Sequence, residues 1–335
     1  MGKVAKIARR TFLIGSAAVA GGVAFGVYAV NKPHANPLED GLAAGEATFN
    51  PWVKVDSNGI TLIAPHADSG QGVASMQAML IAEEMDLDWD QFEIDFGKPS
   101  AAYYNRALGL EMAPYNSHDT SFPANTTRGI LGALTKVMGL QGTGGSSSVP
   151  DSFNKLREAG AIARETLKKA AAKRTKAPLS ELKTSAGSVI LPNGETIPYT
   201  ELAADAASIA PVKSVSLRDP SQWRLVGKEI KRLDILAKST GTQDYGIDVK
   251  IDGMVYAAVK TNPRQGGALN GFDASTAEDM PGFKKIVQIS NGVAVIANNT
   301  WNAFQAANAI DFDWGPAPYP AEMDGHWAEV SSSFT

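Results

Sequence analysis

The chain has 335 residues, enough for two domains that each bury a core. Its 44% apolar and 20% charged residues are typical of a globular protein. The net charge of −4, without a long basic run beyond the extreme N-terminus, argues against nucleic-acid binding. The chain has no cysteine, which excludes disulfides, thiolate nucleophiles and iron–sulfur clusters held by its own residues. The four histidines lack metal-ligand spacing, so we expect no metal site made of protein ligands.

Residues 1–37 have the order of an export signal, with basic residues first and apolar residues second. Arg9-Arg10 resembles a twin-arginine signal, and the apolar stretch from Phe12 to Val30 is near the roughly 20 residues needed to cross a bilayer. No clear cleavage site follows, which favours an uncleaved anchor over a removed peptide. The basic residues before the stretch predict a cytoplasmic N-terminus and a periplasmic body. The alternative is an ordinary secretory signal with two arginines together by coincidence.

A linker over 38–50 leads to a predicted strand, glycine loop, helix and strand. Residues 60–64 are β-branched and apolar, as in a buried strand, and Ser69-Gly70-Gln71-Gly72 forms the loop. Residues 73–85 predict a helix with one apolar face, and Phe92, Ile94 and Phe96 alternate as in a second strand.

The carboxylates at the end of that helix have two interpretations. They could form an acid/base cluster, but we expect most of them to form a solvated helix end, because the sequence around them offers no apolar environment that would perturb a carboxylate. The residues concerned are Glu83, Glu84, Asp86, Asp88 and Asp90.

Residues 97–141 predict a long irregular loop with tyrosines packed among Asn, Ser and Pro. A second glycine loop follows, Gly142 to Ser148, and then a helix over 150–174 with Ser148 as its N-cap. Residues 51–175 would form one domain, 176–240 a connecting region, 241–318 a second unit of mixed α and β structure, and 319–335 a tail. The predicted fold class is α+β.

Both glycine loops run directly into a predicted helix N-terminus. Such a junction presents unpaired backbone N–H groups and the positive end of the helix dipole, which suit a phosphate group. Glycine allows a ligand close to the backbone, Gln71 adds an amide, and Ser146 to Ser148 add hydroxyls. Taken alone, the first loop is also compatible with a tight strand-to-helix turn, and the second with a flexible linker. Neither matches a Walker A or GxGxxG motif.

The segment Pro65 to Val73 resembles the Gly-Gln-Gly segment of molybdenum hydroxylases, the xanthine dehydrogenase and aldehyde oxidase superfamily. Gly144 to Val149, with the helix after it, looks like a second cofactor loop, and 245–282 is similar to the start of the family's hammerhead domain. Both loops precede the hammerhead-like unit, an order that resembles the large subunit of isoquinoline 1-oxidoreductase and of membrane-bound aldehyde dehydrogenases.

The resemblance implies a molybdopterin-binding domain followed by a hammerhead-like domain. It also implies an enzyme that hydroxylates an N-heterocycle or oxidises an aldehyde with oxygen from water. Electrons would pass to an iron–sulfur small subunit, with a cytochrome c subunit as a further candidate partner, and the cytosine dinucleotide is one candidate form of the cofactor. The expected cofactor contacts are Gly70, Gln71, Gly72, Gly144, Gly145, Ser146, Ser147 and Ser148.

Two features depart from the family pattern. Asp68-Ser69 stands where relatives more often have Glu-Met before Gly-Gln-Gly. The family's large subunits are about twice as long, and their catalytic glutamate lies near the far C-terminus, so we name no catalytic residue here. We therefore expect this chain alone to be inactive, either because it is truncated or because a second polypeptide supplies the missing region. The rival hypothesis is a non-catalytic, membrane-anchored periplasmic binding or assembly protein that keeps the fold.

Overall fold

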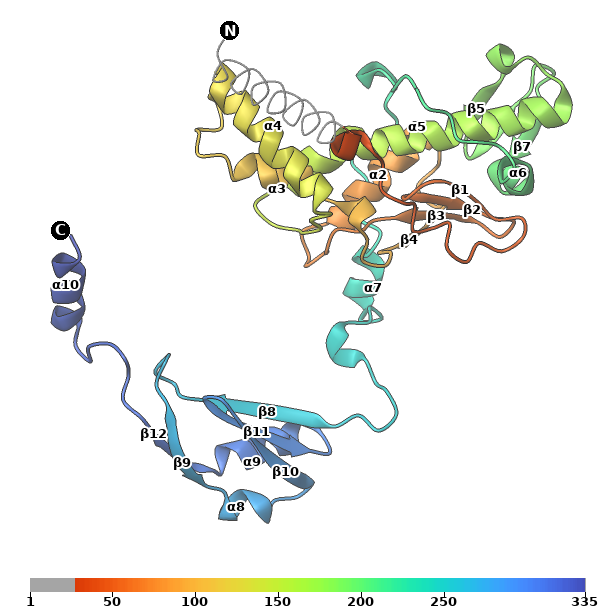
Figure 1. The fold of residues 1–335 in the computed structure, drawn as a ribbon. Coiled ribbons are helices and arrows are strands. Elements are labelled where there is room, and N and C mark those ends of the chain that lie inside the picture. Colours follow the sequence, from red (N-terminus) through yellow and green to blue (C-terminus); the bar gives the residue numbers. More distant parts are fainter. Residues whose placement is uncertain (1–27, 335) are drawn as a thin grey trace, which may run out of the picture. The chain divides into compact units, whose positions relative to one another are not determined.

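The computed structural model describes residues 28–334 and divides the chain into two units, with the boundary between Gln243 and Asp244 (Figure 1). In chain order the first unit contains β1 (Ala47–Asn50), β2 (Val53–Val55), β3 (Ile60–Ile63), α2 (Val73–Met85), β4 (Glu93–Asp95), η1 (Ala101–Tyr103), α3 (Arg106–Glu111), α4 (Phe122–Val137), α5 (Ser148–Thr175), η2 (Leu179–Glu181), β5 (Lys183–Ser185), β6 (Ser188–Ile190), β7 (Thr196–Pro198), α6 (Tyr199–Ala206), η3 (Pro220–Gln222) and α7 (Ile235–Thr240).

The predicted strand, glycine loop, helix and strand are confirmed as β3, α2 and β4. The sheet has the order β1-β2-β3-β4; its first three strands are antiparallel, and β4 pairs parallel to β3. A parallel pair needs a crossover, and α2 supplies it. Val53 and Val55 point to the face that α5 covers, whereas Lys54 between them points to the opposite face.

The helix α2 is buried on almost every side, not on one face as its sequence predicts. It packs along α5, and a Cβ at Gly160 would come within 2.4 Å of the carbonyl oxygen of Ile81. Only glycine permits this approach of the two backbones. The apolar core of the first unit forms around this helix pair and the sheet.

The prediction that most of the carboxylates at the end of α2 are solvated is wrong, because three of the five are buried. Glu83, Glu84 and Asp86 are at most 4% exposed. The Glu84 carboxylate lies 2.8 Å from Nη2 of Arg157 and 3.6 Å from Nη1 of Arg164, both on α5. Burial is possible because each carboxylate has cationic or N–H partners. Those partners lie far away in the sequence, so local composition did not reveal them.

Glu83 and Asp86 bind residues from the later part of the first unit through hydrogen bonds and ion pairs. Glu83 accepts the backbone N–H groups of residues 224–226, at distances between 2.7 and 3.0 Å. Asp86 pairs with Arg218 and Arg224 and accepts the hydroxyl of Thr184. The three carboxylates therefore attach residues 184–226 to the end of α2.

Residues 176–240 contribute to the first core. Here β5, β6 and β7 form a three-stranded antiparallel sheet, followed by α6. Val189, Tyr199 and Leu202 are fully buried, and the hydroxyl of Tyr199 donates to the carbonyl of Met85 at 2.9 Å. This stretch therefore belongs to the same folded unit as the glycine loops.

The irregular loop predicted for residues 97–141 is wrong, because the stretch contains η1, α3 and α4. The helical signal of α4 in the sequence is weakened by its two glycines and by the three threonines or asparagines in its first half. Its buried residues are small, namely Ala124, Gly132 and Thr135, so the usual apolar stripe toward the core is missing.

The second unit is mixed α and β, as the sequence predicts. It contains η4 (Gly246–Asp248), β8 (Tyr256–Thr261), β9 (Leu269–Asp273), α8 (Ser275–Glu278), β10 (Phe283–Ile289), β11 (Gly292–Ala297), α9 (Thr300–Asn308), β12 (Asp311–Trp314) and α10 (Met323–Ser332). The strands form two sheets, β10-β11-β8 and β12-β9. The inner face of β11 packs on α9 through Val293, Val295, Ala303 and Ala307.

We predict that Glu84→Ala lowers the free energy of unfolding of the first unit by about 3–5 kcal/mol, because it leaves two buried guanidinium groups without their carboxylate. Chemical denaturation followed by circular dichroism measures the change. Asp90→Ala, at an exposed carboxylate just beyond the same helix, is the control and should stay within about 0.5 kcal/mol of the parent. Equal effects of the two substitutions would contradict a structural role for Glu84.

Candidate functional site

The two glycine loops meet at one hollow of about 600 Å³. It lies where the first loop enters α2 and the second loop enters α5. Of the residues expected to bind a cofactor, Gln71, Gly72, Gly144, Ser146 and Ser148 line the hollow, whereas Gly70, Gly145 and Ser147 do not. The other lining residues are Ser69, Val73, Met76, Thr143 and Val149.

His66 joins the two loops. Its Nδ1 lies 2.8 Å from the hydroxyl of Ser148, and next to it the backbone N–H of Ala67 donates to the hydroxyl of Thr143 at 2.9 Å. The side-chain oxygen of Gln77 accepts the backbone N–H of His66. Burial lowers the pKa of His66, so its ring is neutral at pH 7. A neutral imidazole can both donate and accept, which suits a hydrogen bond with a hydroxyl.

The positive end of α2 is occupied by a carboxylate of the chain itself. Asp68 accepts the backbone N–H groups of Gly70 at 2.9 Å and Ala74 at 3.1 Å. Partial burial disfavours the charged carboxylate, but these N–H bonds outweigh it and hold the pKa of Asp68 below its usual value. The expectation that both helix ends are open to a phosphate group is therefore wrong for α2.

Gln71 supports its own loop. Its amide oxygen accepts the backbone N–H of Ser69 at 2.7 Å, and its amide nitrogen donates to the carbonyl of Ala67 at 2.9 Å. An amide nitrogen carries two hydrogens, so the second one is available to a ligand in the hollow.

The N-terminus of α5 is the open one. The N-cap is Ser147 instead of the predicted Ser148, and among the described residues no side chain caps the first turn. The hydroxyl of Ser147 bonds instead to the carbonyl of Gly144 at 2.6 Å. The N–H groups at the start of a helix have no partner within the helix. Those of Ser148 and Val149, two residues that line the hollow, are therefore available to a ligand. This end of α5 suits an anion.

The glycines of the second loop have different roles. A Cβ on Gly144 would meet nothing within 4 Å, so this backbone borders open space. A Cβ on Gly145 would lie 2.4 Å from a carboxylate oxygen of Glu111, and its φ of +58° also favours glycine. Ser146 has a φ of +57°, an uncommon conformation for a residue with a side chain. Such strained residues are frequent at ligand sites.

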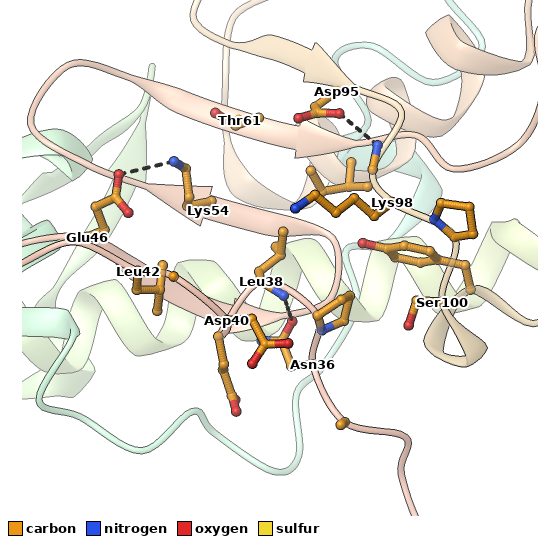
Figure 2. Close-up of a pocket in the computed structure, with 18 residues that line it drawn as sticks. Asn36, Leu38, Asp40, Leu42, Glu46, Lys54, Thr61, Asp95, Lys98 and Ser100 are labelled. Atoms are coloured by element: carbon orange, nitrogen blue, oxygen red, sulfur yellow. Dashed lines mark hydrogen bonds and ion pairs between the residues drawn. The ribbon is translucent and has the colours of Figure 1, made fainter.

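A larger cavity of about 840 Å³ lies against the sheet face that carries Lys54 and Thr61 (Figure 2). Residues 35–42 form its other wall, and Lys54 pairs there with Glu46 at 3.2 Å. This cavity could not be predicted, because a Pro- and Gly-rich linker does not reveal what it packs against. It shares no lining residue with the hollow at the two loops.

Two other expectations concern a metal site and a membrane-spanning helix. Within residues 28–334 no cluster of three or more potential metal ligands occurs. No helix in that range is both long and apolar enough to cross a membrane. Most of the predicted anchor, residues 1–27, lies outside the described residues.

The chain is similar in sequence to three oxidoreductases. It is 27% identical to the isoquinoline 1-oxidoreductase beta chain of Brevundimonas diminuta, over 95% of this chain and 42% of that protein. It is 29% identical to a membrane-bound aldehyde dehydrogenase of Gluconacetobacter polyoxogenes, named for pyrroloquinoline quinone, over 93% of this chain and 38% of that protein. This chain is a homologue of these oxidoreductases. The sequence resemblance to their family is thereby confirmed.

A third relative is a nicotinate dehydrogenase subunit of Pseudomonas putida, 29% identical over 75% of this chain and 19% of that protein. The chain thus spans about two fifths or less of the length of these homologues. No protein-family model matches it.

Solved structures of molybdenum hydroxylases resemble short parts of the chain. The aldehyde oxidoreductase of Desulfovibrio gigas is 22% identical over 36% of this chain and 18% of its own, with a TM-score of 0.25. A Cu,Mo-CO dehydrogenase is 18% identical over 29% of this chain and 16% of its own, with a TM-score of 0.24. Likenesses of this extent support no inference about the function of this chain.

We predict that His66 makes stability depend on pH. Its folded pKa is below 6.5, so the unfolded chain binds more protons and the folded state loses stability as pH falls through and below 6.5. His66→Gln keeps a hydrogen-bonding group without this titration, and its stability should fall less between pH 7 and pH 5. Denaturant midpoints at both pH values measure the difference. His118→Gln, at an exposed histidine, should follow the parent. A parental pH dependence in His66→Gln would disprove the assignment.

Proposed function

We propose that this chain is part of a molybdopterin-dependent oxidoreductase that hydroxylates an N-heterocycle or oxidises an aldehyde. The names of its homologues support this range of substrates, since they refer to isoquinoline, nicotinate and aldehydes. The observation that carries the proposal is the hollow where both glycine loops meet at the open N-terminus of α5.

The residues at the hollow fit a phosphate-bearing pterin. The N–H groups of Ser148 and Val149 suit its phosphate, and the hydroxyl of Ser146 and the second amide N–H of Gln71 suit its polar ring edges. The backbone at Gly144 leaves room for close approach. When bound, the cofactor supplies a molybdenum centre that transfers oxygen derived from water to the substrate and accepts two electrons.

His66 acts in this proposal as a positioning residue. It holds Ser148 on α5 against the segment that carries the first loop, so both loops keep one relative position. Asp68 keeps the first loop closed around the start of α2, which leaves the phosphate a single open helix end.

Partner subunits complete the proposed enzyme. We assign the iron–sulfur clusters that accept the electrons to a separate small subunit, and the lack of cysteine in this chain agrees with that assignment. A cytochrome c subunit is a candidate for the next step. The catalytic base comes from the region of the homologues that this chain does not span.

We also propose that the protein is exported by the twin-arginine route and held at the periplasmic side of the membrane. The basic and apolar residues 1–37 support this, as does one homologue that is named membrane-bound. The twin-arginine route exports folded proteins, which agrees with cofactor insertion before export.

The first experiment is metal analysis of the complex isolated from membranes through a tag on this chain. About one molybdenum per chain supports the proposal. A quinone chromophore without molybdenum would favour the cofactor for which the aldehyde dehydrogenase homologue is named. Neither cofactor in a folded protein would favour the non-catalytic binding or assembly protein, in which Asp68 has taken the place of a bound anion.

We predict that Gln71→Ala in the complete enzyme weakens retention of the cofactor by up to about tenfold. The variant loses one hydrogen bond to the cofactor and the two bonds from Gln71 to the backbone of its own loop. Molybdenum per chain and turnover measure the effect. Gln288→Ala, at an exposed glutamine on β10, is the matched control. Unchanged occupancy and turnover in Gln71→Ala would count against a cofactor contact.

We predict different outcomes for two adjacent glycines. In Gly144→Leu the new side chain extends into open space, so the chain still folds. The side chain occupies space proposed for the cofactor, so the variant retains little molybdenum. Gly145→Ala forces a contact with Glu111 in a left-handed conformation, so it lowers the unfolding midpoint. Thermal unfolding and metal analysis of both variants separate the two roles. Full molybdenum content in folded Gly144→Leu would contradict the placement of the cofactor.

A further inference from the structure

The helix α4 has its small residues inside and its large apolar residues outside. Ala124, Gly132 and Thr135 are buried, whereas large apolar side chains along the helix face solvent. Exposure is 84% at Phe122, 57% at Ile130, 49% at Leu134 and 48% at Val137. A helix on the surface of a globular protein normally has the opposite arrangement.

The inner face of α4 is in close contact with α3. A Cβ on Gly109 of α3 would come within 2.5 Å of the carbonyl oxygen of Leu131, so the two helix backbones are in close contact. Small residues permit such contact between helices. Figure 1 shows α3 and α4 side by side at the edge of the first unit. Turning α4 to bury its large side chains would break this packing.

The exposed apolar residues are concentrated in α4 and in the segments next to this helix pair. Within the described part of the first unit, fourteen large apolar side chains are exposed, and eight of them lie in residues 106–140. They are Met112, Tyr115, Phe122, Ile130, Leu134, Val137, Met138 and Leu140. A group of exposed apolar side chains in one part of the chain is typical of a site of contact with another apolar phase or protein.

The charge of α4 favours an anionic surface as that partner. The helix has two basic residues, Arg128 and Lys136, and no acidic residue, although the whole chain has a net charge of −4. Lys136 is next to Val137 of the apolar side, whereas Arg128 lies on the opposite side of the helix, where its guanidinium donates to the carbonyls of Asp119 and Asn116. A basic residue beside an apolar face is typical of helices that lie in the headgroup region of anionic membranes.

The chain is also tethered at this helix. The ring of His34 donates from Nε2 to the carbonyl of Lys136 in the last turn of α4, at 2.7 Å. The apolar stretch of the predicted anchor ends at Val30, and four residues reach at most about 14 Å. If that stretch crosses the bilayer, as the proposed function holds, the end of α4 lies at the membrane surface.

We propose that α4 lies in the membrane interface with its stripe of Phe122, Ile130, Leu134 and Val137 among the lipids. The proposal rests on the proposed anchor, and it adds a second membrane contact that fixes how the first unit faces the bilayer. Lys136 on the same helix would lie at the level of the lipid phosphates.

The absence of cysteine allows a direct test on the full chain. Leu134→Cys is labelled with an environment-sensitive fluorophore, and the full-length protein is reconstituted into vesicles of phosphatidylcholine with phosphatidylglycerol. Iodide in the water and nitroxide groups on the lipids then act as two quenchers. Ile130→Cys is a second position on the stripe, should the first variant fold poorly. Glu195→Cys, at an exposed turn of the same unit, is the control.

We expect the labels at positions 130 and 134 to be quenched by lipid nitroxides and protected from iodide, and the label at 195 to behave in the opposite way. Quenching by iodide as strong at 134 as at 195 would overturn the proposal. Protection from both quenchers would also overturn it, because a protein segment would then cover the stripe. The result is independent of molybdenum content, so failure of the membrane contact and failure of the proposed function are distinguishable.

Discussion

The first unit depends on the burial of Glu84 between two arginines of α5. A fully buried carboxylate is stable only when partners compensate its lost hydration, and Arg157 and Arg164 do so from a helix that packs against α2. Glu84 also accepts the backbone N–H of Arg218 at 3.2 Å from both oxygens. One side chain thus fixes α2, α5 and a distant loop together. Because the hollow lies between the first turns of α2 and α5, its geometry follows from this pairing and from the close contact at Gly160.

The central part of the fold could be predicted because its signals are local. The strand at 60–64, the loop at Gly70 to Gly72 and the helix at 73–85 each have a pattern contained in a few residues. The ion pairs around Glu83, Glu84 and Asp86 could not be predicted, because a carboxylate in sequence looks the same whether its partner is water or an arginine 73 residues away. The helix α4 was missed for a related reason, since the periodicity that identifies a helix assumes that large apolar residues face the core.

The candidate site shows the same division. The sequence indicated both glycine loops, and the structure brings them to one hollow. The sequence could not indicate that Asp68 closes one helix end or that Gly145 is needed for packing beside Glu111. Nor could it indicate that the hydroxyl of Ser147 donates to the carbonyl of Gly144 in the same loop. Each of these facts concerns which group a short polar side chain faces, and that depends on the backbone geometry of the loop.

Asn105 connects the candidate site to α4. It is fully buried, its side-chain oxygen caps α3 by accepting the N–H of Ala107, and its amide nitrogen donates to the carbonyl of Gly142 and the hydroxyl of Ser147 in the second loop. Asp151 in the first turn of α5 adds a bond to the backbone N–H of Arg106 at 2.7 Å. The pair α3–α4 is therefore attached rigidly to the loop that borders the hollow. If α4 rests on lipid, the membrane sets the direction from which substrate and partner subunits can reach the site.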